Sequence, residues 1–349
     1  MNVTLQGLAT ALAPYELPQD LVQERAKTVL GPKYPQFERL LSTFVQSGIE
    51  RRRSVAPLEW FDDGAHGWAE RNRIWHDGCA AMWREAAEGA LSDAGWRGDE
   101  VDVVITVSTS GLATPTLEAV CHEALGFRPD VMRVPVFGLG CAGGASGLSI
   151  AAQLAQGRPG SKVLLVVVEA CTPSFRTDRL QKSDIIATVL FGDGAAAACL
   201  STDGDGAVTL SPGVQHMWPD TLGIMGWDVD DEGLGVVFDR AIPAFVTAHM
   251  PEAVDAALTA MRRERDDFDR LLCHPGGAKV LTALEASLEL GQGALDLERD
   301  VLREHGNMSA PTVLFVLDAA RRGGHTGRFL LSALGPGFTA SFVPLEIAA

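Results

Sequence analysis

The sequence predicts an α/β protein in which buried strands alternate with amphipathic helices. Short, nearly continuous apolar runs recur along the chain, which is typical of strands covered on both faces. The segments between these runs carry apolar residues three and four positions apart, as helices packed on a sheet do. The chain has 349 residues, of which 46% are hydrophobic, so it can bury one large core or two moderate ones.

The predicted elements follow in chain order. The clearest strands are apolar runs bounded by polar or turn residues, at 101–107, 162–168, 195–200, 270–273 and 328–334. The predicted helices are segments with a helical period, at 74–94, 116–125, 144–155, 242–262, 276–289 and 309–321.

The polar, glycine-rich stretch 201–213 is the predicted boundary between two halves. We therefore expect an N-terminal half over residues 1–210 and a C-terminal half over residues 211–349. In each half a buried strand leads into a loop with a reactive side chain and then into a helix. This repeated pattern suggests a duplicated unit.

Charge and hydropathy exclude several classes of protein. The 29 Lys and Arg residues face 45 Asp and Glu residues, a net charge of −16, so nucleic-acid binding is disfavoured and an anionic ligand needs a local basic patch. The longest aliphatic run, 163–168, is far shorter than the roughly 20 residues of a membrane-spanning helix. The first residues lack a basic segment followed by an apolar one, so we expect a cytoplasmic protein.

The six cysteines include no Cys-x-x-Cys pair, which favours reduced thiols over disulfides or a zinc cluster, and no metal site is expected.

Cys141 is the first candidate for chemistry, in the segment Gly-Cys-Ala-Gly-Gly. It precedes a predicted small-residue helix, and the positive end of a helix dipole lowers the pKa of a thiol. The glycines after it allow close approach to another backbone, which a second subunit could supply. The alternative is a buried, inert cysteine in a packed helix.

Two further candidates follow in the C-terminal half. His274 ends the predicted strand 270–273, and a side chain at that end of an open α/β sheet faces the crevice where ligands bind. The histidine and its Pro-Gly-Gly turn can equally be structural. Asn307 precedes the predicted helix 309–321, either as its N-cap or as an amide donor to an oxyanion.

These motifs together resemble one family. Gly-Cys-Ala-Gly-Gly around Cys141, Leu-Phe-Gly-Asp-Gly around Phe191, His-Pro-Gly-Gly from His274, Gly-Asn-Met-Ser around Asn307 and Gly-Pro-Gly at 335–337 occur in this order. From about residue 101 to the C-terminus the chain resembles the type III polyketide synthases, the chalcone synthase-like branch of the thiolase fold.

The resemblance implies a thiolase-like α/β/α/β/α layered fold with duplicated halves. It makes Cys141 the nucleophile that holds the growing acyl chain, and makes His274 and Asn307 the donors that polarise the thioester and stabilise the enolate of decarboxylated malonyl-CoA. Such a condensation needs a soft nucleophile and oxyanion donors but no metal or redox cofactor. The implied substrates are an acyl-CoA starter and malonyl-CoA. We also expect a homodimer, through the loop 109–115 and the helix after Cys141.

The substrate pocket implied by the resemblance has mostly small or aliphatic side chains where plant members carry threonines or aromatics. The Met-Gly-Trp-Asp run at 225–228 is similar to bacterial members that make alkylpyrones or alkylresorcinols. Small lining residues leave room for a medium to long fatty acyl starter, whose buried methylenes contribute about 0.8 kcal/mol each. The alternative is that these residues only fill the core. The candidate pocket residues are Thr114, Cys171, Ser174, Phe191, Trp227, Val236, Ser309 and Leu334.

The phosphates of CoA require positive charge in this acidic chain. The candidate CoA residues are Arg39, Arg51 in the run 51–53, Gly276 and Lys279. A charge run is as often a solvated face as a binding site.

Three other functions compete with this assignment. An initiating ketoacyl-carrier-protein synthase shares the fold and the Cys-His-Asn set, but its histidine motif is His-Gln-Ala-Asn. A papain-like protease fits the spacing 274 − 141 = 133, but Cys141 lacks the local sequence of such enzymes. An inactive acyl-CoA-binding scaffold would not need all three polar residues. Release of CO₂ from malonyl-CoA separates a synthase from the last two.

Overall fold

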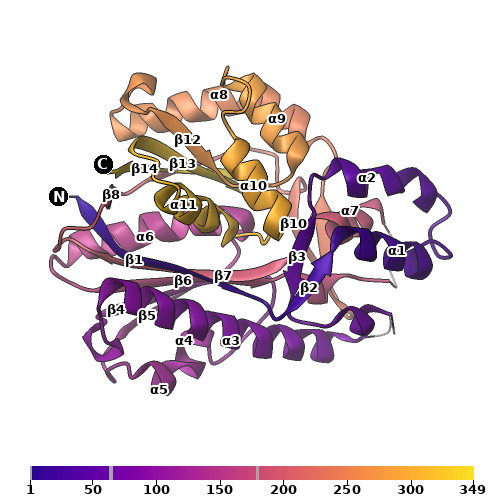
Figure 1. Ribbon diagram of the computed structural model, residues 1–349, viewed down its shortest axis with the longest axis horizontal. Helices are drawn as coiled ribbons and strands as arrows, with labels where there is room; N and C mark the ends of the chain where they lie inside the picture. Colours follow the sequence, from indigo (N-terminus) through magenta and orange to yellow (C-terminus); the bar gives the residue numbers. More distant parts are fainter. Residues whose placement is uncertain (1, 63–65, 178–180) are drawn as a thin grey trace.

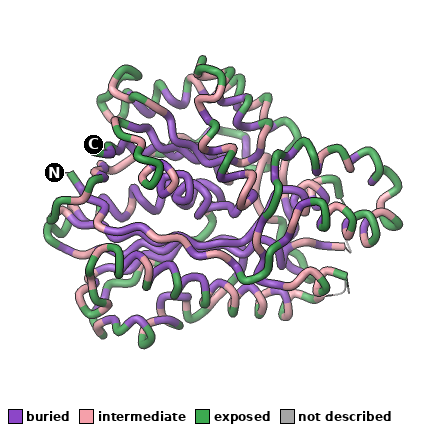
Figure 2. The backbone as a smooth tube through the Cα atoms, in the orientation of Figure 1, coloured by how far each residue is buried: buried purple, intermediate pink, exposed green. Residues whose placement is uncertain are grey.

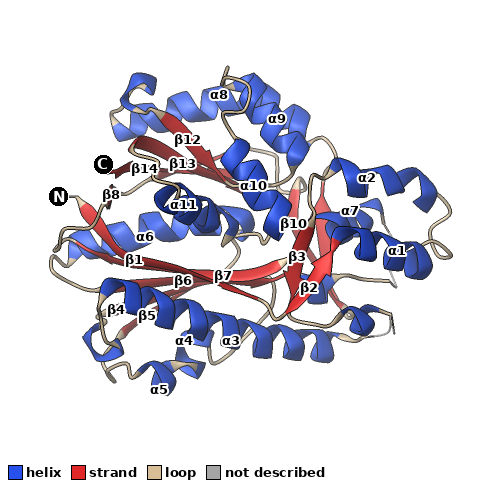
Figure 3. Cartoon of the chain, in the orientation of Figure 1, coloured by secondary structure: helices blue, strands red, loops and turns tan. Residues whose placement is uncertain are grey.

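The computed structural model describes residues 2–62, 66–177 and 181–349. These residues form five layers, in the order helix, sheet, helix, sheet, helix, so the predicted thiolase-like layering is confirmed (Figures 1 and 3). The two sheet layers belong to one 10-stranded, hydrogen-bonded sheet of order β12-β13-β14-β8-β1-β7-β6-β4-β5, with β9 paired to β14. Its strands are β1 (Val3–Leu12), β4 (Val103–Val107), β5 (Met132–Val136), β6 (Val163–Ala170), β7 (Asp193–Ser201), β8 (Val208–Leu210), β9 (Val214–Met217), β12 (Arg270–Cys273), β13 (Gly327–Gly335) and β14 (Thr339–Ile347).

The helices occupy three layers around this sheet. The long α3 (Trp68–Ala94), with the short α4 (Leu117–Val120) and α5 (His122–Leu125), covers the outer face of the N-terminal strands. Two helices, α6 (Gly143–Gly157) and α11 (Thr312–Arg322), lie between the sheet layers. The outer face of the C-terminal strands carries α8 (Ile242–Met261), α9 (Ala278–Ser287) and α10 (Asp296–His305).

A group of smaller elements lies at one end of the layers, at the right in Figure 1. It contains α1 (Gln19–Leu30), α2 (Leu41–Gln46), α7 (Lys182–Leu190), the β2–β3 pair (Tyr15–Pro18 and Arg51–Ser54) and the β10–β11 hairpin (Met225–Asp230 and Gly233–Phe238). Among the described residues, no helix is both long and apolar enough to cross a lipid bilayer.

The apolar runs in the sequence are continuous because both faces of these strands are buried (Figure 2). In β6, Val163, Leu165 and Val167 join the central core around α6 and α11, whereas Leu164 and Val166 join the core under α3. This alternation follows from the two-residue period of a strand.

Most predicted elements are present, with shifted ends. The five predicted strands correspond to β4, β6, β7, β12 and β13. The segment 116–125, expected to be one helix, is two short helices that meet at Cys121. The helix expected from 309 begins at Thr312, because Ser309 has φ +60° and so lies outside helical geometry. The boundary near residue 210 stays a prediction, and the strand there, β8, pairs with β1 on one side and β14 on the other.

Candidate active site

Cys141 lies in a single 3₁₀ turn, Gly140–Ala142, directly before α6. The small residues that follow let the helix approach another backbone closely, since a Cβ atom on Gly144 would lie 2.3 Å from the carbonyl oxygen of Ala310. That backbone belongs to the same chain. This tight contact fixes the helix start, and the thiol itself is 6% exposed.

A buried carboxylate secures the loop in front of the nucleophile. Glu169 is the next-to-last residue of β6 and accepts hydrogen bonds from the backbone N–H groups of Thr109 (3.0 Å) and Ser110 (2.9 Å). The Thr109 hydroxyl in turn accepts the N–H of Gly140 at 3.2 Å. Burial raises the pKa of Glu169 to about 7. Glu169 was not among the predicted site residues, although a lone glutamate near the end of an otherwise apolar strand is a signal of a special position.

His274 follows the last residue of β12, at the predicted place. Its backbone N–H donates to the carbonyl of Ser332 on β13 at 2.8 Å. The side chain is 5% exposed, and neither ring nitrogen has a hydrogen-bond partner within the described residues. The imidazole is therefore available to a substrate.

Asn307 lies between α10 and α11 in an extended segment. Its backbone forms a bridge with Phe191, in which Asn307 donates to the Leu190 carbonyl at 2.9 Å and accepts from Gly192 at 3.0 Å. Of its two alternative roles, that of N-cap of the following helix is wrong, because that helix begins five residues later, at Thr312. The side-chain amide is instead directed to the site by its own hydrogen bonds.

Hydrogen bonds bring the two halves of the chain together at the sulfur. The Cys141 thiol donates to the Ser309 hydroxyl at 3.5 Å and is hydrogen-bonded to the Asn307 side chain. The Asn307 amide oxygen accepts the Ser309 N–H at 2.8 Å, and its NH₂ group donates to the carbonyl of Gly276 at 3.2 Å. Gly276 lies in the turn after His274. Within the described residues no hydrogen bond joins the sulfur to the His274 ring, so direct pairing of the two stays a prediction.

The electrostatics of the nucleophile differ from the expectation. Burial raises the pKa of the Cys141 thiol to about 11, opposed by hydrogen bonds with Ser309 and Asn307. Burial also lowers the pKa of His274 to about 3. The expected lowering by the helix start is wrong for the thiol taken alone, because loss of water outweighs the dipole. One proton transfer from sulfur to imidazole creates both charges together, so a thiolate is favoured here only beside a protonated histidine.

An inner cavity of about 40 Å³ lies beside the sulfur. Its wall comes from the segment after β6, the end of α7 and the β10–β11 hairpin. The predicted pocket residues that line it are Cys171, Phe191, Trp227, Val236 and Ser309.

The other three predicted pocket residues lie elsewhere. Ser174 lines a separate hollow of about 10 Å³ with Arg71 and Leu234. Leu334 is buried in the core of the C-terminal half, where its strand position pairs with Ala340. Thr114 is exposed, on the loop before α4.

An outer cavity of about 570 Å³ adjoins the inner one, and Phe238 lines both. Three of the predicted CoA residues, Arg39, Gly276 and Lys279, lie on its wall. Two further cations, Lys182 and Arg240, were missed because each stands alone in the sequence, at the start of α7 and before α8. None of the four cations forms an ion pair with another residue in the described part of the chain, although Asp239 shares the wall.

The arginine run 51–53 does not form a basic patch. Arg51 pairs with Glu304 at 2.9 Å and does not line the outer cavity. Arg52 is wholly buried and donates to the Phe191 carbonyl at 2.9 Å. The run lies on β3, where successive side chains point to opposite faces. Three consecutive arginines on a strand therefore cannot present one surface.

Two family models match the chain over most of its length. The N-terminal domain of chalcone and stilbene synthases matches residues 59–204, and the C-terminal domain matches residues 209–345. A curated relative, 1,3,6,8-tetrahydroxynaphthalene synthase of Streptomyces peucetius subsp. caesius, is 36% identical over 99% of this chain and 93% of its own.

Solved structures agree with these matches. The crystal structure of 1,3,6,8-tetrahydroxynaphthalene synthase from Streptomyces coelicolor A3(2), a bacterial type III polyketide synthase, superposes with a TM-score of 0.92 at 26% identity over 99% of both chains. The structure of CsyB complexed with CoA-SH gives 0.90 at 25% identity, over 99% of this chain and 100% of that one. The chain therefore belongs to the chalcone and stilbene synthase family and is a type III polyketide synthase, an acyltransferase that condenses CoA thioesters by decarboxylation of malonyl-CoA.

Proposed function

We propose that this synthase loads a medium to long fatty acyl group from CoA onto Cys141, extends it with malonyl-CoA and releases an alkylpyrone or alkylresorcinol. One arrangement supports the catalytic part: the thiol lines an apolar inner cavity, and the Asn307 amide donates to Gly276 on the wall of the adjoining cation-lined outer cavity. An acyl chain directed inward and a CoA directed outward place the thioester carbonyl at the sulfur.

Loading begins with transfer of the thiol proton to the His274 imidazole. The Cys141 sulfur then forms a bond to the starter carbonyl, and the C–S bond to CoA breaks. The departing CoA thiolate takes the proton back from His274, so the site returns to its neutral form. The Asn307 NH₂ group and the imidazolium N–H donate to the oxyanion that develops at the carbonyl.

Extension uses the same two hydrogen-bond donors, His274 and Asn307. The carboxylate of malonyl-CoA leaves as CO₂, and its electron pair forms an enolate whose oxygen accepts hydrogen bonds from His274 and Asn307. The enolate carbon attacks the acyl carbonyl on Cys141 and releases the sulfur. Neither step calls for a metal or a redox cofactor.

The four cations of the outer cavity support binding of the CoA phosphates. Arg39, Lys182, Arg240 and Lys279 come from four segments and converge on one wall in a chain with a net charge of −16. Arg and Lys are the side chains that pair with phosphate oxygens. Arg51 has no part in this proposal, because Glu304 already neutralises it.

The starter preference rests on two hollows lined by the residues that follow Cys171 in the chain. The small hollow at Ser174 and a further apolar one of about 60 Å³, lined by Phe175, share Arg71 as a wall residue. Side chains that separate these hollows from the inner cavity would have to move to admit a long acyl chain. Each methylene buried there adds about 0.8 kcal/mol.

A second starter class has its own support. The inner cavity of about 40 Å³ holds no more than a few water-sized groups. Two relatives are named for a tetrahydroxynaphthalene product, which carries no alkyl chain. A small starter such as malonyl is therefore the competing candidate.

Assembly and location are part of the same proposal. Leu112, Val120, Met132 and Phe137 are exposed apolar side chains on the segments that surround the edge strand β5. An isologous contact between two copies would cover them, together with Thr114 on the same loop. All six cysteines are buried free thiols, which favours the reducing cytoplasm.

The test incubates the protein with labelled malonyl-CoA and a panel of acyl-CoA starters from acetyl to long-chain, with products identified by mass spectrometry. CO₂ release that depends on Cys141, with alkylpyrone or alkylresorcinol products, supports the proposal. A Cys171→Phe variant should depress turnover of long starters far more than of acetyl-CoA, whereas the matched Cys171→Ser variant should keep both. Preference of the wild type for malonyl or aromatic starters over every fatty acyl-CoA would refute the fatty acyl assignment.

A further inference from the structure

The strand that ends at His274 lies at the border of the sheet. β12 is the first strand in the sheet order and pairs only with β13 within the described residues. In a parallel pair, successive backbone N–H groups point to opposite edges of the strand. The His274 N–H faces β13 and donates to Ser332, so the N–H of the preceding Cys273 faces the open edge.

Glu298 of α10 covers that open edge. Its Oε1 atom accepts the Cys273 N–H at 3.0 Å, and its Oε2 atom lies 3.5 Å from the Arg270 guanidinium at the start of the same strand. Glu298 is fully buried. The peptide next to His274 is thus held on one side by a strand and on the other by a carboxylate.

The imidazole depends on this backbone for its position. Neither ring nitrogen of His274 has a hydrogen-bond partner in the described part of the protein, so no side chain fixes the ring through its polar atoms. By contrast, the Cys141 sulfur has polar contacts with Ser309 and Asn307. A displacement of the Cys273–His274 peptide would therefore move the His274 ring with it.

We propose that Glu298 is a positioning residue, which replaces a missing neighbouring strand and fixes the end of β12 so that the His274 imidazole faces the reacting carbonyl. This inference rests on the catalytic role proposed for His274.

The chemistry of the position supports a specific task. A residue that only fills space between α10 and β12 would be apolar, because burial of a carboxylate opposes folding. Burial does raise the pKa of Glu298, to about 7, and the hydrogen bonds from Cys273 and Arg270 act against that rise. The carboxylate accepts a hydrogen bond from the Cys273 N–H, which would otherwise be unsatisfied. An apolar side chain could not do so.

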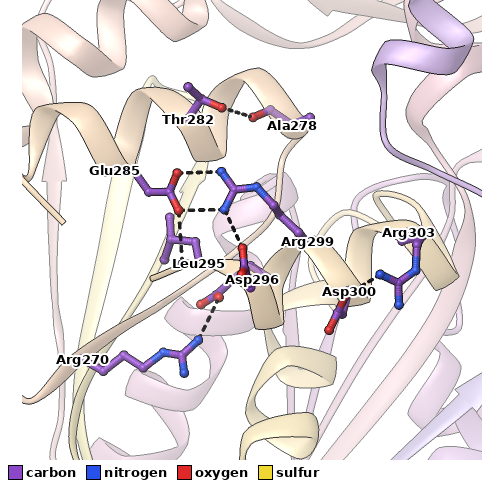
Figure 4. Close-up of polar contacts among 10 residues, drawn as sticks. Arg270, Ala278, Thr282, Glu285, Leu295, Asp296, Arg299, Asp300 and Arg303 are labelled. Carbon is purple, nitrogen blue, oxygen red and sulfur yellow. Dashed lines mark hydrogen bonds and ion pairs between the residues drawn. The ribbon is translucent and has the colours of Figure 1, made fainter. Parts of the chain in front are cut away.

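A neighbouring ion pair supplies the matched control. Arg299 of α10 and Glu285 of α9 form two short hydrogen bonds, at 2.7 Å and 2.6 Å, that join the helices without touching β12 (Figure 4). Glu285→Gln therefore removes a carboxylate charge from the same helix pair and leaves the Cys273 N–H satisfied. It should leave kcat and KM unchanged.

The experiment measures kcat and KM for malonyl-CoA decarboxylation in three Glu298 variants. Glu298→Gln keeps an oxygen acceptor at full reach, Glu298→Met keeps the volume without an acceptor, and Glu298→Asp keeps the charge with shorter reach. The glutamine variant should stay within about twofold of the wild-type kcat, and the methionine variant should lose about tenfold or more with little change in KM. If the methionine variant does not fold, the comparison of the other two decides: a lower kcat in Glu298→Asp than in Glu298→Gln supports the inference.

Two results would overturn the inference: a folded methionine or aspartate variant with wild-type kcat, or a glutamine variant as impaired as the methionine variant. A His274→Gln variant run in parallel separates this failure from that of the proposed function. If His274→Gln decarboxylates as the wild type does, the role of His274 is wrong. If it is inactive while the Glu298 variants are all normal, only the positioning role is wrong.

Discussion

The nucleophile side and the histidine side of the site are built differently. Cys141 follows β5, the strand at the opposite edge of the sheet, but its loop is tied to Glu169 through Thr109, and its sulfur has polar partners. His274 follows an edge strand, and its ring has no hydrogen-bond partner within residues 2–62, 66–177 and 181–349. The thiol is thus fixed by side chains and packing, whereas the imidazole is fixed through its backbone. This difference predicts that remote substitutions disturb the histidine side more readily.

The largest effects should come from variants that remove the nucleophile side or the histidine side of the site, one at a time. We expect Cys141→Ala to abolish the covalent acyl adduct while it retains malonyl-CoA decarboxylation, because His274 and Asn307 remain in place. His274→Gln should lower decarboxylation by about 10²- to 10³-fold, the usual loss for one oxyanion donor, and still form some adduct. Intact-protein mass spectrometry and CO₂ release measure the two activities. Equal loss of both activities in both variants would show that the two sides act as one unit.

The second effect concerns the charge state of the thiol. In His274→Gln the sulfur has no imidazole to accept its proton, and burial raises the pKa of the Cys141 thiol to about 11. Alkylation by iodoacetamide should then still increase with pH at pH 9. In the wild type, proton transfer to the imidazole supplies thiolate at lower pH, so the rate should level off earlier. Coincident pH profiles would mean that no ion pair forms.

A smaller effect should appear in the pH dependence of stability. Burial raises the pKa of Glu169 from its usual 4.5 to about 7, so between these pH values the unfolded chain is ionised while the native side chain keeps its proton. Stability contributed at this position is therefore lost as pH rises from about 4.5 to 7, by at most about 1.4 kcal/mol per pH unit. Glu169→Gln does not titrate, so its unfolding free energy relative to wild type should increase over this range. Urea unfolding at pH 5 and pH 8 tests this, and an unchanged difference contradicts it.

The smallest effect tests the packing behind the nucleophile. Gly144→Ala forces a Cβ atom against the Ala310 carbonyl and should cost about 1–3 kcal/mol of unfolding free energy. Gly157 lies in the same helix, and a Cβ atom added there would meet nothing within 4 Å, so Gly157→Ala is the control and should be neutral or slightly stabilising. Thermal unfolding compares the two variants. Equal midpoints would show that α6 can shift away from Ala310.

The sequence predicts the parts of this protein that depend on local pattern. The run 163–168 has apolar residues at every position because both faces of β6 are buried, and the motifs around Cys141 and His274 occupy the strand and helix ends where they were expected. The parts that it could not predict depend on distant segments. Lys182 and Arg240 become neighbours of one cavity only after folding, and nothing near either residue in the chain marks it.

Misassigned residues have an equally physical cause. Composition alone makes the run 51–53 a basic patch, but the strand period turns its middle arginine into the protein interior. The strand β14 was missed because Pro344 interrupts its apolar pattern, although a proline is tolerated there opposite Leu330. The thiol pKa was misjudged because a sequence shows the helix start but not the depth at which the sulfur is buried.

The strand order has a consequence for synthesis of the protein in the cell. β1 begins at Val3 and β14 ends at Ile347, yet both lie in the interior of the sheet, joined through β8. β14 is synthesised after β8, β9 and β13, so these strands must wait for their central neighbour. The C-terminal half therefore completes its sheet only after β14 has been made. A nascent chain that stops a few residues early leaves those strand edges uncovered, and unpaired strand edges recruit other chains.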